Sequence, residues 1–321
     1  MFLIRHWFLM ILPFALWGTA MTAMAPLVGS GGPLIVASLR LLPAGILLLI
    51  SVPFLGRKLK IAQSDFFWFL LFTFIDASVF QFCLARGLAK TGAGLGSVLI
   101  DSQPLMVALL ARTLFGDAIN PIGWFGLMLG FLGILCLGAP PEILSNLWLM
   151  GKPTSFEILA NNGEIWMLAA AVSMAIGTVL IRFTCKESDP VAITGWHMVL
   201  GSLPLFGWHL SQQEFSIIPT WNAFEWGLMA YATIFGSALA YGLFFWFANR
   251  QELTSFSTLA FLTPVFALGT GGLWLGERLY LLQWLGVGLV LLSVILVSQR
   301  RRIWEPTLSK STISQNQFLS K

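Results

Sequence analysis

The feature that most constrains this chain is a series of apolar segments, each about as long as a bilayer is thick. A helix needs about 20 mostly apolar residues to cross the hydrocarbon core, and segments of roughly this length recur along the whole chain. We place ten of them, at 7–26, 34–54, 65–85, 92–113, 121–138, 164–183, 190–210, 225–246, 254–275 and 280–298. The pattern predicts an all-α integral membrane protein with ten transmembrane helices.

The composition agrees with this fold class. Hydrophobic residues make up 57% of the chain and charged residues only 10%, whereas soluble domains carry about 25% charged residues. The net charge of +4 does not indicate nucleic acid, because the basic residues flank the apolar segments. Three widely spaced cysteines fit neither a disulfide framework nor a metal cluster. We therefore predict no cofactor and no metal.

The distribution of Lys and Arg predicts the orientation. With a cytoplasmic N-terminus, thirteen of these residues fall in inside segments and four in outside segments, so the positive-inside rule favours both termini in the cytoplasm. The first segment resembles a signal peptide, with an Ala-Met-Ala before Pro26, but a proline after the cut and an equivalent helix in mid-chain favour a first span. Because no transit peptide precedes that span, we expect the plasma (inner) membrane of a bacterium.

The chain contains an internal repeat. Shifted by 160 residues, 97–135 lies over 257–295, so that Pro104 meets Pro264 and Trp124 meets Trp284 without a gap; slightly smaller shifts place Arg40 over His197. These matches predict four regions: a first repeat at 7–138, an outside linker at 139–163, a second repeat at 164–298, and a disordered basic cytoplasmic tail at 299–321.

Each repeat holds five spans, which is an odd number. The second repeat must therefore enter the membrane upside down relative to the first. Inverted repeats are a recurrent architecture of secondary transporters, whose binding sites lie near the midplane between the halves. The repeat thus favours transport, although channels and structural membrane proteins can also be duplicated.

Several motifs carry a family resemblance. They are Leu16-Trp17-Gly18-Thr19, Pro33 with Arg40, Pro104 with Gly116-Asp117, and Pro264 with Gly276-Glu277-Arg278. With them the chain resembles the EamA-type proteins of the drug/metabolite transporter (DMT) superfamily. The strings AGLGS…IDSQPL, SMAIGT and TPVFA are similar to cyanobacterial and chloroplast members related to the plant "walls are thin" transporters. The resemblance implies alternating access and a substrate among amino acids, nucleotides, other metabolites and drugs.

Three charged residues lie at membrane depth, where each is costly and indicates function. Arg40, Asp76 and Asp101 fall roughly 9–14 Å below the outer surface at about 1.5 Å per helical residue. We expect them to meet in the bundle, with Arg40 paired to one carboxylate. The other carboxylate would then bind a proton or an amine of the substrate. Alternatively, the charges serve only to lock the helices together.

Further residues extend this candidate site. His197 occupies the place of Arg40 in the second repeat, either as a proton acceptor or as an interhelical hydrogen-bonding group. Pro104 and Pro264 predict helix kinks in corresponding spans. The predicted substrate-binding or coupling residues are Arg40, Asp76, Asp101, Gln103, Gln81, His197, Trp17 and Tyr241.

Together these features predict a secondary transporter of a small polar or amphipathic metabolite, such as an amino acid. We expect no enzyme, because the chain has no HExxH, GxSxG or P-loop motif. Its partners would be the substrate and the lipid bilayer, with proton coupling and a homodimer left open. The alternative is a passive channel or a non-transporting membrane sensor or assembly protein.

Overall fold

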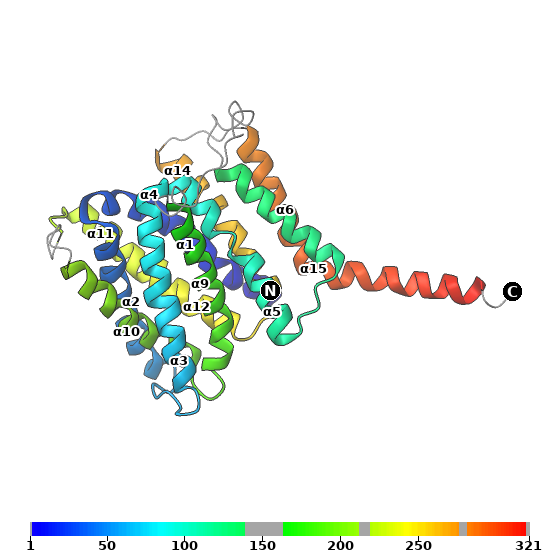
Figure 1. Cartoon of the computed structure of the whole chain (residues 1–321), viewed down its shortest axis with the longest axis horizontal. Helices are drawn as coiled ribbons and strands as arrows, with labels where there is room; N and C mark the ends of the chain where they lie inside the picture. The colour runs from blue at the N-terminus through cyan, green and yellow to red at the C-terminus, as the bar shows by residue number, and fades with distance from the viewer. Residues whose placement is uncertain (1, 139–162, 212–218, 276–280, 319–321) are drawn as a thin grey trace.

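The computed structural model describes residues 2–138, 163–211, 219–275 and 281–318, and all regular elements in these ranges are helices (Figure 1). The first half contains α1 (Phe2–Gly31), α2 (Pro33–Phe54), α3 (Phe66–Phe72), η1 (Thr73–Val79), α4 (Phe80–Ile100), α5 (Gln103–Phe115) and α6 (Pro121–Gly138). The second half contains α9 (Gly163–Thr184), α10 (Pro190–Ser211), α11 (Ala223–Thr233), η2 (Ile234–Leu239), α12 (Ala240–Ala248), α13 (Leu253–Ser257), η3 (Thr258–Leu262), α14 (Thr263–Leu275) and α15 (Leu281–Phe318).

Many of these helices suit a bilayer. Within the described ranges, seven helical stretches are long and apolar enough to cross a membrane: His6–Met24, Pro33–Phe54, Phe66–Gly87, Ile165–Thr184, Ala223–Ala248, Leu253–Thr270 and Leu281–Arg300. Gln103–Phe115 and Pro121–Leu137 are shorter apolar helices. The remaining expected span, 190–210, corresponds to α10. This helix carries more polar residues than the seven apolar stretches, and it packs along α2.

Two π-helical segments interrupt the spans expected at 65–85 and 225–246. They are η1 (Thr73–Val79) and η2 (Ile234–Leu239), and they fall at corresponding places in the two repeats. A π-helix carries an extra residue per turn, which rotates the side chains that follow, and such segments are frequent at functional sites. The predicted regular α-helices are therefore wrong at these points, and Asp76 lies inside η1.

The chain reverses direction between Gly87 and Gln103. Gly87 packs against Met167 near the start of α9, whereas Gln103 bonds to Thr178, eleven residues further along the same helix. No non-helical residue separates the spans expected at 65–85 and 92–113, since α4 is helical to Ile100. The fourth span is instead interrupted at Asp101 and Ser102, which form a turn.

The two prolines lie in the first turns of helices, directly after a turn or a 3₁₀ segment. Pro104 is in the first turn of α5, and Pro264 follows the 3₁₀ segment η3 in the first turn of α14. At a helix N-terminus the missing proline N–H leaves no broken hydrogen bond. The predicted kinks inside continuous helices are thus corrected to helix starts.

Small residues allow the two repeats to pack closely. The backbones of Gly45 on α2 and Gly195 on α10 approach each other, and a Cβ at Gly45 would lie 2.7 Å from the Gly195 carbonyl oxygen. Gly133 on α6 and Gly286 on α15 make a similar contact, and the α6–α15 pair lies at one side of the bundle (Figure 1). Glycines at such crossings are typical of transmembrane helix packing.

The tail differs from its predicted disorder over 299–321. Helix α15 continues to Phe318 and projects away from the bundle (Figure 1). A helix that already spans the membrane extends one residue at a time without a new nucleation cost, which explains the continuation. The predicted linker at 139–163 lies outside the described residues except for Gly163, as do Gly276, Glu277 and Arg278.

Candidate functional site

Four predicted residues from four helices meet in the interior. The Nη2 of Arg40 on α2 donates to Oε1 of Gln81 on α4 at 3.1 Å, and Nε2 of Gln81 donates to the hydroxyl of Tyr241 on α12, also at 3.1 Å. The Arg40 guanidinium lies 6.0 Å from the centre of the Tyr241 ring, and that ring packs 5.0 Å from Trp17 on α1. Gln81 and Tyr241 are 160 residues apart, so equivalent positions of the two repeats bond to each other.

The expected pairing of Arg40 with a carboxylate is wrong. Arg40 is only 6% exposed, and no salt bridge among the described residues involves it. In the same ranges its Nε and the indole Nε1 of Trp17 have no hydrogen-bond partner. Arg40 therefore presents a buried positive charge whose hydrogen-bond partner, Gln81, is neutral, because the helix rotations direct Asp76 to His197.

Asp76 pairs with His197 across the two halves. The Nε2 of His197 on α10 lies 2.9 Å from Oδ2 of Asp76 on η1, and both side chains are 1% exposed. The His197 Nδ1 lies 3.0 Å from the carbonyl oxygen of Thr194, one turn earlier on α10. The imidazole is thus held at both nitrogens, and its orientation is set by backbone and carboxylate together.

Aromatic rings and a glycine enclose this pair. The Phe72 ring stacks on the imidazole with centroids 4.4 Å apart, and Phe245 meets it edge-on at 5.6 Å. On α9, a Cβ at Gly177 would lie 2.1 Å from Oδ1 of Asp76. Only a residue without a side chain fits there, and Oδ1 has no hydrogen-bond partner among the described residues.

Asp101 and Gln103 lie beside this centre on a third element. Gln103 donates from Nε2 to the Thr178 hydroxyl at 3.0 Å, and Thr178 adjoins Gly177. Asp101 is buried at the α4–α5 turn, and the hydrogen bonds among the described residues include none to its carboxylate. The expected meeting of Arg40, Asp76 and Asp101 is therefore not observed in the described ranges: Arg40 bonds to Gln81, Asp76 pairs with His197, and Asp101 bonds to neither Arg40 nor Asp76.

Comparison with known families now adds to this geometry. The EamA-like transporter family matches residues 5–139 and again 161–299, which together cover most of the chain. The chain belongs to the EamA-like transporter family. It is therefore a multi-pass membrane transporter with two EamA units, and not an enzyme.

Relatives of this EamA chain come from several organisms. An uncharacterized transporter of Synechocystis is 48% identical over 307 residues, covering 94% of this chain and 92% of its own length. A chloroplastic WAT1-related protein of Arabidopsis thaliana is 43% identical over 300 residues, covering 91% and 69%. An uncharacterized inner membrane transporter of Escherichia coli K12 is 24% identical over 297 residues, covering 89% and 88%.

A solved structure supports the fold. It is titled only "Crystal structure of protein", and it superposes with a TM-score of 0.76 over 92% of this chain and 96% of its own, at 14% identity. Together with the two family matches, this confirms an all-helical membrane protein with a duplicated unit. The predicted family and fold class are both confirmed, whereas the comparisons leave the substrate open.

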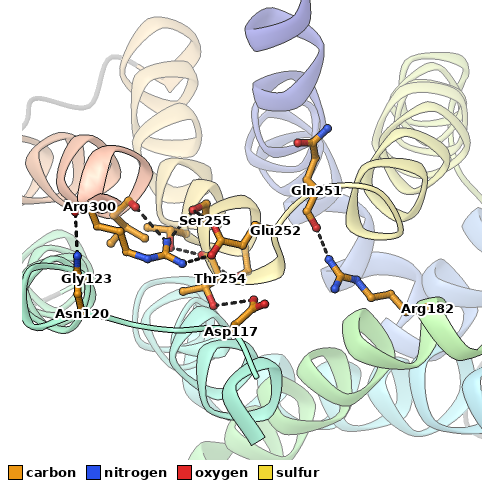
Figure 2. Close-up of polar contacts among 12 residues, drawn as sticks. Asp117, Asn120, Gly123, Arg182, Gln251, Glu252, Thr254, Ser255 and Arg300 are labelled. Carbon is orange, nitrogen blue, oxygen red and sulfur yellow. Dashed lines mark hydrogen bonds and ion pairs between the residues drawn. The ribbon is translucent and has the colours of Figure 1, made fainter. Parts of the chain in front are cut away.

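A second group of polar contacts in the EamA chain joins the two halves at one end, which we call the basic end (loops 55–65, 116–120, 185–189 and 249–252). Figure 2 shows Arg300 of α15 directed to Glu252, with a further bond of 2.7 Å from Nη1 to the Ser255 hydroxyl. From the first half, Asn120 donates to the Arg300 carbonyl oxygen at 2.8 Å, and Asp117 accepts from Thr254 at 3.4 Å (Figure 2).

The same end is closed by a second set of contacts. Arg57 after α2 forms a 3.0 Å salt bridge with Asp189 before α10. The fully buried Asp65 accepts hydrogen bonds on Oδ2 from the backbone N–H groups of Glu187 and Ser188, at 2.9 and 2.8 Å. Loops of the two repeats are therefore bonded directly to each other at the basic end.

The thiol of Cys185, which follows α9 at this end, is expected to react slowly. Burial raises its pKa to about 12, and the Asp65 and Asp189 carboxylates act in the same direction. Since the thiolate is the reacting form, maleimide should label Cys185 at least about a hundredfold more slowly at pH 7 than a thiol of ordinary pKa, about 8.5. The rate should rise with pH toward 12.

The measurement uses a variant in which Cys83→Ala and Cys136→Ala leave Cys185 as the remaining thiol. Its matched control carries Cys185→Ala and Glu187→Cys as well, since Glu187 is exposed two residues away. Equal labelling rates in the two proteins at pH 7 would contradict the assignment.

Some residues of the site had only weak sequence signals. Gly177 aligns with Gly18 in the repeat, yet that match does not reveal a contact with Asp76. Gln81 and Tyr241 are separated by the repeat distance, which could have suggested their pairing. Thr194 and Phe72, which hold and cover the imidazole, carry no sequence signal that we can identify.

Proposed function

We propose that this transporter moves a small polar metabolite with a carboxylate group, such as an amino acid, by alternating access and without ATP. The observation that supports it is the Arg40 guanidinium, a buried cation that no acid of the described residues neutralises. A buried charge is costly without a partner, and a carboxylate can bind a guanidinium through two parallel hydrogen bonds.

The surroundings of Arg40 suit an amphipathic ligand. Trp17 and Tyr241 supply aromatic surface next to the guanidinium, and binding sites for small molecules combine such surface with a few polar groups. The unpartnered Nε atom of Arg40 and Nε1 atom of Trp17 are two donors for an incoming carboxylate. Gln103 and Asp101 lie on the neighbouring element, where they would contact the polar end of the substrate.

Alternating access is supported by the contacts between repeats. In the described conformation, one salt bridge and several hydrogen bonds between the halves close the basic end. In inverted-repeat transporters, one repeat rocks against the other around a central site. Opening the basic end would break these contacts, while Arg40 would remain between the halves.

We further propose an inner-membrane location with both termini and the basic end in the cytoplasm. The excess of Lys and Arg in the loops of that end supports this orientation through the positive-inside rule. The E. coli relative is named an inner membrane transporter, whereas the Arabidopsis relative is chloroplastic. A homodimer stays a prediction.

The function is tested with purified protein in liposomes, supplied with a ¹⁴C-labelled mixture of the standard amino acids. We expect saturable uptake by the wild type and at least about a tenfold loss in Arg40→Gln, since removing one partner of a buried charged contact costs more than about 1.4 kcal/mol. Arg112→Gln is the matched control, because Arg112 is exposed near the end of α5.

Three outcomes would contradict the proposal. Absence of wild-type uptake would exclude amino acids as substrates. Uptake that does not saturate would favour a channel. Equal uptake by Arg40→Gln and Arg112→Gln would remove Arg40 from the binding site.

A further inference from the structure

We propose that Asp76 and His197 together form a binding site for one proton, and that this proton couples substrate transport to the pH gradient. The coupling rests on the proposed function, whereas the proton site itself does not. The argument begins with the hydrogens that the geometry requires.

The proton count follows from the two contacts of the imidazole. A backbone carbonyl oxygen only accepts, so the 3.0 Å contact between Nδ1 and the Thr194 oxygen places a hydrogen on Nδ1. A neutral imidazole then has a lone pair on Nε2, and an ionised carboxylate has only acceptors. Two acceptors would repel each other at 2.9 Å. One proton must therefore lie between Nε2 and Oδ2.

Charge explains why the pair retains a single proton. With one proton the pair is neutral overall, either as imidazolium and carboxylate or as imidazole and carboxylic acid, so the proton belongs to both residues. Loss of the proton would leave a net negative charge at a site that is 1% exposed, and a second proton would leave a net positive one. Both are disfavoured away from water.

The neighbouring elements leave few other charges near the pair. The titratable groups of this region are Tyr241 of α12, which interacts with Asp76 and bonds to Gln81, and Arg40 of α2, which bonds to the same Gln81. The buried Asp101 at the α4–α5 turn is a further acid beside them. Helices α3 and α9 present Phe72 and Gly177. Arg182, the next charged residue on α9, is directed away to Gln251 (Figure 2).

Two further observations favour a functional role over simple packing. Asp76 lies in the π-helix η1, a type of distortion that is frequent at functional sites, and its Oδ1 has no partner among the described residues. The pair also occurs once: at the repeat-equivalent positions, Arg40 replaces His197 and Gly236 replaces Asp76, and these two residues cannot share a proton.

Coupling follows from the placement of the pair. Asp76 belongs to the first repeat and His197 to the second, so rocking of the repeats would change their distance. A proton taken from water on one side would stay between Nε2 and Oδ2 while the pair is closed. When the repeats separate toward the other side, water would solvate both groups and the proton would leave.

The proton site is tested with full-length protein in nanodiscs, labelled with ¹⁵N-histidine. The chain has three histidines, so His197→Gln assigns the signal of interest. In the wild type we expect a protonated Nδ1 and an Nε2 shift displaced from that of an unbonded neutral imidazole. In Asp76→Asn the amide N–H₂ donates to Nε2 and keeps the packing, and we expect loss of this displacement.

The matched control is Glu187→Gln, which removes an exposed acid and should leave the His197 signal unchanged. The proposal would be overturned by a wild-type His197 that titrates like free histidine in the same buffer. It would also be overturned by an Asp76→Asn spectrum equal to that of the wild type.

Coupling is measured separately in liposomes with the ¹⁴C amino acid mixture, with and without a pH gradient. We expect the gradient to stimulate wild-type and Glu187→Gln uptake, and the stimulation to be lost in Asp76→Asn. Stimulation that persists in Asp76→Asn would overturn the coupling. If the wild type takes up no amino acid, the proposed substrate class fails, while the histidine spectra still decide on the proton site.

Discussion

Gly177→Ala is expected to destabilise the protein by about 3 kcal/mol, the upper end of the range for overpacked cores. The added Cβ would lie 2.1 Å from Oδ1 and 2.7 Å from Cβ of Asp76, so the Asp76 side chain and its π-helical backbone must move. Because Oδ2 of the same carboxylate bonds to His197, the movement would also separate the Asp76–His197 pair. We expect a lower melting temperature in nanodiscs and an altered His197 ¹⁵N signal.

A second glycine on the neighbouring helix provides the control. Gly207 on α10 has no atom within 4 Å of a built Cβ, so Gly207→Ala should be neutral or stabilising by up to about 1 kcal/mol through helix propensity. If Gly177→Ala is as stable as Gly207→Ala and leaves the His197 signal in place, α9 does not pack on Asp76 as described.

Glu252→Ala is expected to cost about 3 kcal/mol, because it would leave a buried Arg300 without its acid. Removing one member of a buried ion pair costs roughly 3–5 kcal/mol, and the lower value applies since the Glu252 side chain is 27% exposed. Arg300 is 1% exposed and also holds Ser255 (Figure 2). The loss should therefore loosen α15 and the start of α13 at the basic end.

This result is measured as a fall in melting temperature together with faster hydrogen exchange in residues 249–257. Glu187→Ala is the control, because it removes an equal charge from an exposed position at the same end. If the two variants have equal stability, the Arg300–Glu252 contact contributes little, and the bonds of Arg300 with Asn120 and Ser255 are sufficient to hold it.

The fold was largely predictable because membranes impose strict rules on sequence. Apolar segments must be helical and of a minimum length, and a duplication with an odd number of spans forces inversion. These rules led to the spans, the two repeats and the family resemblance, and the family and fold comparisons confirmed the family and the fold class. The irregular segments η1, η2 and η3 escaped prediction, since hydropathy does not depend on whether the chain bonds four, five or three residues back.

The sequence predicted which residues belong to the candidate site, but it did not predict which of them contact each other. Ionisable residues are rare inside a bilayer, so their position within the spans was enough to identify four candidates: Arg40, Asp76, Asp101 and His197. Which acid meets which base depends on the rotation of each helix: Asp76, within η1, meets His197, whereas Arg40 bonds to Gln81. Gly177 matters only because α9 passes over that carboxylate.

Local composition, span length and repetition therefore specify that this chain crosses a membrane as two inverted halves, because each depends on residues close together in sequence or on a regular repeat. The Asp76–His197 contact, the Arg40 guanidinium that meets no acid among the described residues, and the closed basic end arise from helix rotation and interhelical distance. Those quantities are set by side-chain packing among residues more than a hundred positions apart, and no local pattern in the chain encodes them.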